Sequence, residues 1–434
     1  MNSLVKRLIK GFIKDLAIAL LSLAATPAPA QVSASGEVLS PAQQKIAWAQ
    51  AEIGKNPKRY QPHNQLAIAL ARRARETSDV NYYVQAEAAL DKSFALSPGN
   101  LDGLKAQTWI LLGKHEFAKA AALAKQLNAR WPDDVLIYGF LTDANVELGN
   151  YAEAEKAAQW MLDIRPGNVP GLTRAAYLRE LFGDIDGSVE LMEMAYQQTP
   201  PNELEDRAWI LSHIAHLRSQ TGKLSEAENL LQQALALFPN YHYALGQLAR
   251  VKTMQGRHSE AVDLLSVRYR NAAHAENAYT LAEALERAGR TTEAQKLFAE
   301  FEATGQKELE LTDNANRELI FYYVDHANRP VEALRIAKLE VARRHDAYTL
   351  EAYAWALSAN GKNDEAQTNI VRALTVGLRD AQLLYHAGAI AARSGDVDAA
   401  RNWLKESLEA NPVSEYSGPA RDALAKLPAL SIAL

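Results

Sequence analysis

The stretch TGKLSEAENLLQQALALFPNY, residues 221–241, contains the spacing that decides the fold of this chain. Its Gly222 is followed by Ala227 five positions later and by Pro239 seventeen positions later. The stretch LGNYAEAEKAAQWMLDIRPGN, residues 148–168, has Gly, Ala and Pro at the same spacing. A catalytic motif normally occurs once in a chain, so a spacing that recurs indicates architecture rather than chemistry.

Residues suited to a tight turn recur along the chain at intervals of 33, 34 or 39 residues. These turn positions are Asn81, His115, Gly149, Gly183, Gly222, Gly256, Gly289, Asn328, Gly361 and Gly395. A small residue follows each of them five positions later: Ala86, Ala120, Ala154, Ser188, Ala227, Ala261, Ala294, Ala333, Ala366 and Ala400. A period of this length over so much of a chain predicts a repeat solenoid.

Each repeat contains two helical stretches joined by the turn. Leu211, Ile214 and Leu217 recur at helical spacing before Gly222, and residues 224–237 form a second amphipathic pattern after it. Glycine accepts the backbone conformation of the turn, and alanine lets the two helices approach closely. Proline ends the second helix because it has no amide donor and its ring clashes with the preceding turn.

The period and the Gly, Ala and Pro positions resemble those of the tetratricopeptide repeat family, whose unit is 34 residues long. The resemblance covers residues 60–414 and implies an all-α, right-handed helical-repeat solenoid of about ten helix-turn-helix repeats. Extra residues are expected near 201–207 and 305–314. Residues 41–57 are expected to form an N-terminal helix, and residues 415–434 a C-terminal capping helix and tail, because terminal helices cover the ends of such stacks.

The first 30 residues have the features of a secretory signal peptide. A basic start precedes the apolar run LAIALLSLAA, residues 16–25, and Ala28 and Ala30 form the small-residue pattern of a signal-peptidase site. We therefore expect residues 1–30 to be removed, residues 31–40 to form a short linker, and the protein to be periplasmic or secreted. The alternative is an uncleaved anchor, but the run is shorter than the roughly 20 residues that a spanning helix needs. We expect no membrane span after signal removal.

The composition argues against several classes of protein. The net charge of -5, with scattered Lys and Arg, does not suit nucleic-acid binding. The absence of cysteine excludes disulfides, thiolate sites and a lipid-modified N-terminal Cys, so the protein is not expected to be a lipoprotein. The sequence has no hydrolase, phosphate-loop or dinucleotide motif, so we expect neither an enzyme nor a cofactor.

Two groups of titratable residues were considered as sites of chemistry. His213 and His216 lie three positions apart and could begin a zinc site, but no neighbouring carboxylate or histidine on the same face of the repeat completes it, so we expect no metal. Glu283, Glu286 and Glu318 are interpreted as solvated helix faces rather than as an acid/base pair.

The family resemblance implies a binding groove, because the first helix of each tetratricopeptide repeat lines the concave face. Aromatic residues make up 8% of the chain but are enriched at the groove positions. The predicted groove residues are Trp109, Tyr177, Trp209, Tyr243, Tyr279, Tyr322, Tyr348, Trp355 and Tyr385, with His216, Arg250 and Glu283 among the polar ones. Trp209, Tyr243 and Tyr279 are expected to form a continuous strip. Alternatively, some of the rings pack between repeats, which we expect for a third to a half of them.

A concave face of this kind suits a non-enzymatic interaction scaffold or adaptor of the cell envelope. Its partner would be an extended peptide or a helix of another protein. The alternative is a module that binds a glycan or a peptidoglycan fragment in the same groove, because stacked aromatic rings with polar neighbours also hold sugars. An enzyme with an unrecognised site between repeats ranks below both.

Overall fold

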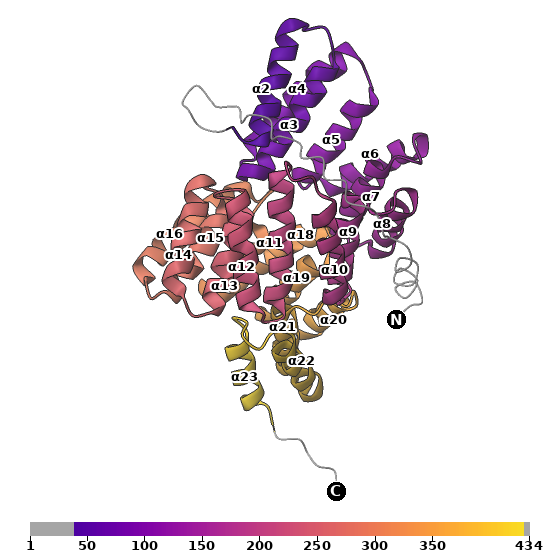
Figure 1. Ribbon diagram of the computed structural model, residues 1–434. Coiled ribbons are helices and arrows are strands. Elements are labelled where there is room, and N and C mark those ends of the chain that lie inside the picture. The colour runs from indigo at the N-terminus through magenta and orange to yellow at the C-terminus, as the bar shows by residue number, and fades with distance from the viewer. Residues whose placement is uncertain (1–38, 429–434) are drawn as a thin grey trace. The chain divides into compact units, whose positions relative to one another are not determined.

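The computed structural model describes residues 39–428, which form 22 α-helices and one short π-helical segment without any strand (Figure 1). The predicted all-α helical-repeat fold is therefore confirmed. The expected signal peptide and nearly all of the expected linker lie outside the described residues.

Twenty helices form ten successive antiparallel pairs, and each pair is one repeat. The pairs are α3 (Gln61–Thr77) with α4 (Asn81–Leu96), α5 (Leu101–Gly113) with α6 (Phe117–Arg130), α7 (Val135–Glu147) with α8 (Tyr151–Ile164), α9 (Val169–Leu181) with α10 (Ile185–Gln198), α11 (Leu204–Gln220) with α12 (Leu224–Leu237), α13 (His242–Met254) with α14 (His258–Asn271), α15 (Ala275–Arg287) with α16 (Thr291–Glu308), α17 (Asn316–Phe321) with α18 (Pro330–Arg343), α19 (Ala347–Ala359) with α20 (Asn363–Leu374), and α21 (Ala381–Ser394) with α22 (Val397–Ala410). The repeats are numbered one to ten below.

The turn inside each repeat contains a residue with left-handed backbone conformation. From the second repeat to the tenth this residue is the one predicted, including His115 at φ 56° and Asn328 at φ 49°, where the other seven positions are glycines. In the first repeat the prediction of Asn81 is wrong, because Asn81 is the first residue of α4 and Ser78 has the positive φ of 61°. The helix α3 runs for 17 residues and ends at Thr77, so Ser78 takes the capping position.

The small residues five positions after the turns are all buried. The nine alanines and Ser188 each have at most 1% of their surface exposed. A side chain without atoms beyond Cβ, or with a single hydroxyl, fits where the two helices of a repeat approach most closely. The spacing that identified the repeats is therefore the contact between paired helices.

The extra residues predicted in two places are accommodated mainly by longer helices. The helix α11 has 17 residues and α16 has 18, whereas α13 and α15 each have 13. The first helix of the eighth repeat changes from α17 to the π-helical segment η1 (Tyr322–His326).

One further helix lies at each end of the repeats. The helix α2 (Pro41–Lys55) begins with a capping box in which the Ser40 hydroxyl accepts from the backbone of Gln43 and the Gln43 side chain accepts from the backbone of Ser40. The helix α23 (Ser417–Lys426) packs beside α22. Between residues 39 and 428, no helix has the length and hydrophobicity of a membrane span.

Candidate functional site

Repeats that are far apart in sequence meet along one line of contacts, which we call the seam. Each contact joins the turn of one repeat to the connection that precedes the repeat six further on. The contacts are His274 with the Ser78 carbonyl, Thr312 with the Lys114 carbonyl, Arg344 with Glu147, Ala347 with Tyr151, and Asn411 with the Ser219 carbonyl. The last joins the turn of the fifth repeat to the connection before α23.

The offset along the seam is almost constant. The partners are separated by 196, 198, 197, 196 and 192 positions. A helical arrangement produces a constant offset when one full turn contains about six repeats. The buried core also crosses the seam, because one hydrophobic cluster contains Val146 and Leu181 together with Leu350 and Leu378. Successive turns of the solenoid are therefore in contact.

Ion pairs at a shorter offset, of 130 and 131 positions, join the first repeat to the start of the fifth. Arg72 and Arg75 on α3 face Glu203 and Glu205 at the start of the fifth repeat, with nitrogen-to-oxygen distances of 3.0 and 3.1 Å. Both arginines also approach Asp206. The Tyr241 hydroxyl donates to Glu205 at 2.8 Å, so the carboxylate accepts from two repeats besides its own.

Three of the predicted tyrosines lie on the surface that the superhelix encloses, which we call the inner face. Burial raises the pKa of Tyr177 most, and the nearby Glu147 and Tyr348 raise it further, although Tyr348 belongs to the ninth repeat. Burial likewise raises the pKa of Tyr243, with Glu180 two repeats away as the next cause. The hydroxyls of Tyr177, Tyr243 and Tyr348 make no hydrogen bond within residues 39–428. All three side chains are half-buried, and the rings of Tyr177 and Tyr243 contact His213 and Tyr241, respectively.

A buried carboxylate joins two histidines on the same face. Glu180 of α9 contacts the Nε2 atoms of His213 and His216 at 2.9 and 3.1 Å, and Gln220 donates to it at 3.2 Å. Burial alone would raise the pKa of Glu180, but the hydrogen bonds and charges of the histidines hold it well below its usual range. Trp209 stacks on His213 with ring centroids 5.4 Å apart.

The sequence interpretation missed this carboxylate. It found no acidic residue near His213 and His216, whereas the structure brings Glu180 between them from the preceding repeat. The sequence signal is an acidic residue followed by a histidine one repeat length later. A similar spacing, of 35 residues against 33 for Glu180 and His213, relates Glu351 to His386, which meet at 2.9 Å and are both almost fully buried. Even so, no cluster of three or more potential ligands suited to a metal ion occurs in the described part of the chain.

Four of the predicted groove aromatics each pack against two or more other rings, and two of these four are buried. Tyr279 is 7% exposed and contacts Phe298 and Phe301 of its own repeat. The expected strip of Trp209, Tyr243 and Tyr279 is therefore not continuous, because Tyr279 belongs to the core between α15 and α16. Trp355 is 5% exposed, stacks on His386 and donates its indole N–H to Asp325. Tyr322 stacks on Phe298, and Tyr385 contacts Trp355 and Tyr416.

Trp109 is half-buried beside two hydrophobic clusters near the start of the solenoid. Trp109 therefore packs against hydrophobic side chains of the first three repeats.

The acidic residues of the middle repeats have environments that the sequence did not indicate. Glu318 had been interpreted as part of a solvated helix face, but burial and the nearby Glu276 raise its pKa to about 7. Glu283 accepts from the Tyr279 hydroxyl at 3.1 Å, and His326 lies 3.2 Å from Glu286. Ion-pair and hydrogen-bond partners thus hold both Glu283 and Glu286.

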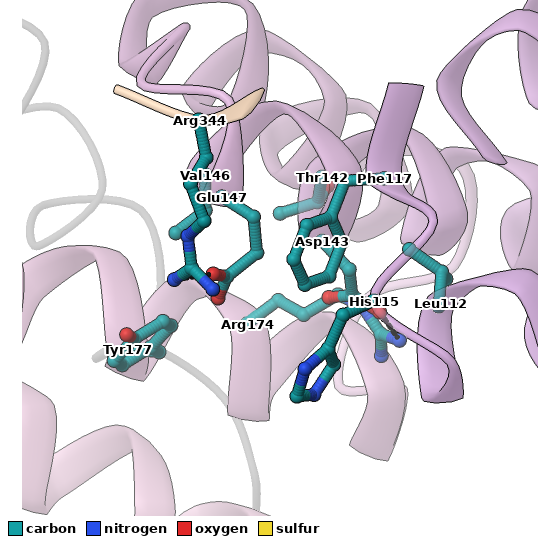
Figure 2. Close-up of a pocket in the computed structure, with 10 residues that line it drawn as sticks. All are labelled: Leu112, His115, Phe117, Thr142, Asp143, Val146, Glu147, Arg174, Tyr177 and Arg344. Atoms are coloured by element: carbon teal, nitrogen blue, oxygen red, sulfur yellow. Dashed lines mark hydrogen bonds and ion pairs between the residues drawn. The ribbon is translucent and has the colours of Figure 1, made fainter. Parts of the chain in front are cut away.

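A cavity of about 430 Å³ lies where the seam crosses the third repeat (Figure 2). Its wall includes Leu112 and Phe117 as apolar side chains and Arg174, Tyr177 and Arg344 as polar ones. Figure 2 shows Arg344 reaching Glu147 from a separate connection of the chain. Burial raises the pKa of Glu147 to about 7, and Arg344 offsets part of that increase.

A second cavity, of about 300 Å³, contains three of the predicted groove residues. Tyr243, Arg250 and Glu283 line it together with Gln247 and Arg268. The structure therefore brings together polar and aromatic residues of the sixth and seventh repeats in one cavity.

Comparison with known families identifies the repeats. Family models described as tetratricopeptide repeat match residues 106–169, 219–268 and 352–415. These three stretches are therefore tetratricopeptide repeats, which confirms that part of the sequence interpretation. Proteins of these families are generally non-catalytic scaffolds that bind proteins or peptides. No match was found among curated protein sequences.

Three solved structures illustrate the similarity of fold. The Cut9–Hcn1 hetero-tetramer of the APC/C has 15% identity and a TM-score of 0.45, and the match covers 88% of this chain and 57% of that one. The human IFIT1 dimer with PPP-AAAA has 12% identity and a TM-score of 0.46, with coverage of 85% and 95%. The type IV pilus biogenesis factor PilW has 16% identity and a TM-score of 0.40, with coverage of 46% and 91%. At these identities the likeness concerns the fold alone.

Proposed function

We propose that this protein is a non-enzymatic scaffold that binds an extended segment of another protein on its inner face. The tetratricopeptide-repeat fold suggests an interaction scaffold in general terms. The observation that carries the proposal is the set of three half-buried tyrosine hydroxyls, on Tyr177, Tyr243 and Tyr348, that have no hydrogen-bond partner within residues 39–428. Tyrosine suits such a surface because its ring packs while its hydroxyl bonds to a ligand or to water.

The seam supports an extended segment over a helix as the partner. Contacts between successive turns restrict entry to the inner face from the side. An extended chain is narrower than an α-helix, whose diameter with side chains is about 10–12 Å. An extended segment therefore reaches the inner face with less opening of the seam.

We further propose that the scaffold acts outside the cytoplasm, in the cell envelope or after secretion. The support is the basic start, the short apolar run and the Ala28–Ala30 pattern at the N-terminus. Intact-mass measurement of the exported protein should give Gln31 as its first residue. A full-length species extracted only from membranes would instead indicate an anchor.

No observation favours the glycan alternative. Sugar binding by stacking requires exposed ring faces, whereas Tyr279 and Trp355 are buried and Trp209 is stacked on His213.

The proposal is tested by removing the three hydroxyls. The triple variant Tyr177→Phe, Tyr243→Phe and Tyr348→Phe should keep the melting temperature of the native chain, because no hydrogen bond within the described chain is lost. Capture of the partner should fall about tenfold or more, since each lost hydrogen bond is worth about 0.5–1.5 kcal/mol.

The partner is identified by photo-crosslinking in the native host from a crosslinker placed at residue 243. The same crosslinker at the exposed Trp160 position gives the background. Tyr138→Phe is the matched control, because this tyrosine stacks against Trp160 rather than lining the inner face. Capture from position 160 but not from position 243, or undiminished capture by the triple variant, would contradict the proposal.

A further inference from the structure

The second cavity contains polar groups that the protein itself leaves without partners. Within residues 39–428, Arg250 forms no ion pair or hydrogen bond, although it lies close enough to Tyr243 to influence the pKa of its hydroxyl. The side-chain Oε1 of Gln247 and the Nε of Arg268 are buried and have no hydrogen-bond partner. Buried polar atoms in native proteins are nearly always bonded, so orphaned ones need an explanation such as a ligand.

The groups without partners include both hydrogen-bond donors and a hydrogen-bond acceptor. Arg250, the Nε–H of Arg268 and the Tyr243 hydroxyl can donate, whereas the Oε1 of Gln247 can only accept. A ligand that satisfies all of them carries an acceptor group for the arginines and a donor group for Gln247. An unpaired guanidinium favours a carboxylate as the acceptor, because the two groups match in charge and geometry.

The carboxylates of Glu276 and Glu283 line the same cavity. Glu276 pairs with Arg268 at 3.3 Å and Glu283 accepts from the Tyr279 hydroxyl, each through Oε1, so within the described residues the Oε2 atoms are left for a cationic donor of the ligand. Glu276 and Glu283 stand on α15, opposite the α13 residues Gln247 and Arg250. The Glu276 side chain is about half exposed, with 53% of its surface accessible. Some desolvation raises its pKa, but the charges of Arg268 and His274 hold it below its usual range, so this carboxylate is ionised at neutral pH. A ligand ammonium would lie near these acids and donate to Gln247.

The volume of the cavity and its apolar lining residues indicate the size of the ligand and the kind of side chain it carries. The volume is about 300 Å³, and Ala249, Leu265 and Ala284 supply small apolar surfaces. The cavity is bounded on another side by Glu415, which pairs with Arg287 at 2.8 Å from the connection before α23. The space suits a single amino acid with a medium-sized apolar side chain rather than a polypeptide segment.

We propose that this cavity is a binding site for a small zwitterion, namely a free apolar α-amino acid, with its carboxylate on Arg250 and Arg268 and its ammonium near Gln247, Glu276 and Glu283. The site goes beyond the scaffold function, because it takes a small molecule. It shares the Tyr243 hydroxyl with the inner face but depends on Arg250 and Arg268, which the scaffold proposal does not use. Binding of the amino acid is measured on the purified full chain without any protein partner. A negative result would therefore refute this site and leave the scaffold proposal untouched.

The test is isothermal titration calorimetry with three probes that share the leucine side chain and differ at their charged groups. L-Leucine has both charges, N-acetyl-L-leucine lacks the ammonium, and L-leucinamide lacks the carboxylate. L-Leucine should bind with saturable heat, and both analogues should bind at least tenfold more weakly. Equal binding of N-acetyl-L-leucine would overturn the zwitterion and indicate a site for a carboxylate alone, such as that at a polypeptide C-terminus.

Two variants separate the site from the fold. Arg250→Gln should weaken L-leucine binding at least tenfold while the melting temperature stays unchanged, because Arg250 makes no bond within the described chain that could be lost. The control is Arg257→Gln, a more exposed arginine that pairs with Glu260 outside the cavity and should leave L-leucine binding unchanged. No saturable heat with L-leucine at millimolar concentration, or undiminished binding by Arg250→Gln, would refute the proposal.

Discussion

The hydroxyl of Tyr151, at the start of α8, accepts a hydrogen bond of 2.8 Å from the backbone N–H of Ala347, at the start of α19. Ala347 is 1% exposed, so its amide has no access to water as a substitute partner. The next two amides of α19 donate to the Asp346 side chain. A tyrosine from a distant repeat thus completes the N-terminal cap of this helix, and the turns of the superhelix depend on each other for their backbone hydrogen bonds.

Tyr151→Phe should therefore destabilise the chain by about 1–3 kcal/mol, the usual cost of leaving a buried donor unsatisfied. The free energy of unfolding measured in urea gives the difference. Tyr269→Phe is the control, because that hydroxyl makes no hydrogen bond within residues 39–428. Equal stabilities of the two variants would show that the bond between α8 and α19 does not form.

Gly149→Ala should destabilise the chain more than Gly289→Ala. Both glycines have left-handed conformations, with φ of 76° and 75°, so both variants incur the strain of about 1–2 kcal/mol that a Cβ causes there. A Cβ at Gly149 would also lie 2.5 Å from the His345 carbonyl oxygen across the seam, whereas nothing lies within 4 Å of one at Gly289. Because both variants share the backbone strain, the difference between their melting temperatures measures the contact across the seam alone. Equal melting temperatures would show that Gly149 does not approach His345.

Ala227→Leu should destabilise the fifth repeat by about 1–3 kcal/mol through overpacking. Ala227 is fully buried in α12 at the closest approach to α11, so a larger side chain would force the helices apart. Ser225→Leu introduces the same side chain at an exposed position of the same helix and should have little effect. Similar urea midpoints for the two variants would show that the close contact lies elsewhere in the repeat.

Glu318→Gln should stabilise the chain at pH 8 and have a much smaller effect at pH 5. Burial, together with the charge of Glu276, raises the pKa of Glu318 from 4.5 to about 7. Between these values the folded chain keeps a proton that the unfolded chain has released, so the contribution of this group to stability falls as pH rises and is lowest above pH 7. Glutamine removes that cost.

The difference in melting temperature between Glu318→Gln and the native chain, followed from pH 5 to pH 8, gives the measurement. Glu190→Gln is the control, because Glu190 is exposed and has no ion pair within residues 39–428. A difference that does not grow with pH would mean that Glu318 is solvated.

The fold could be predicted because its determinants are local. The positive φ of Gly222 and the burial of Ala227 depend only on the turn and on the two helices that it joins. A similar local pattern recurs in every repeat. The seam could not be predicted in this way. A period fixes which repeats are neighbours, but the pitch accumulates from a small rotation per repeat. The repeats also differ in length, because α11 has 17 residues and α16 has 18, so no single rotation per repeat follows from the period.

The candidate site was predictable only in part, for a related reason. Position in the repeat selected Tyr243 and Arg250, and both line the second cavity. The same rule placed Tyr279 on the groove, whereas the ring is buried against Phe298 and Phe301. The two phenylalanines on α16 extend the core toward the groove side of α15, and no rule based on the first helix alone takes account of the second.

The constant offset along the seam also limits how the array can change. In a solenoid whose repeats touch only their neighbours, stability is nearly a sum of local terms, and repeats can be gained or lost one at a time. Here the deletion of one internal repeat would bring Tyr151 opposite the wrong connection and displace the partners on both sides of it. Unfolding of one repeat likewise removes contacts from a repeat six positions away. The chain should therefore unfold with greater cooperativity than a linear array of the same length, and its number of repeats should be a fixed property of the molecule.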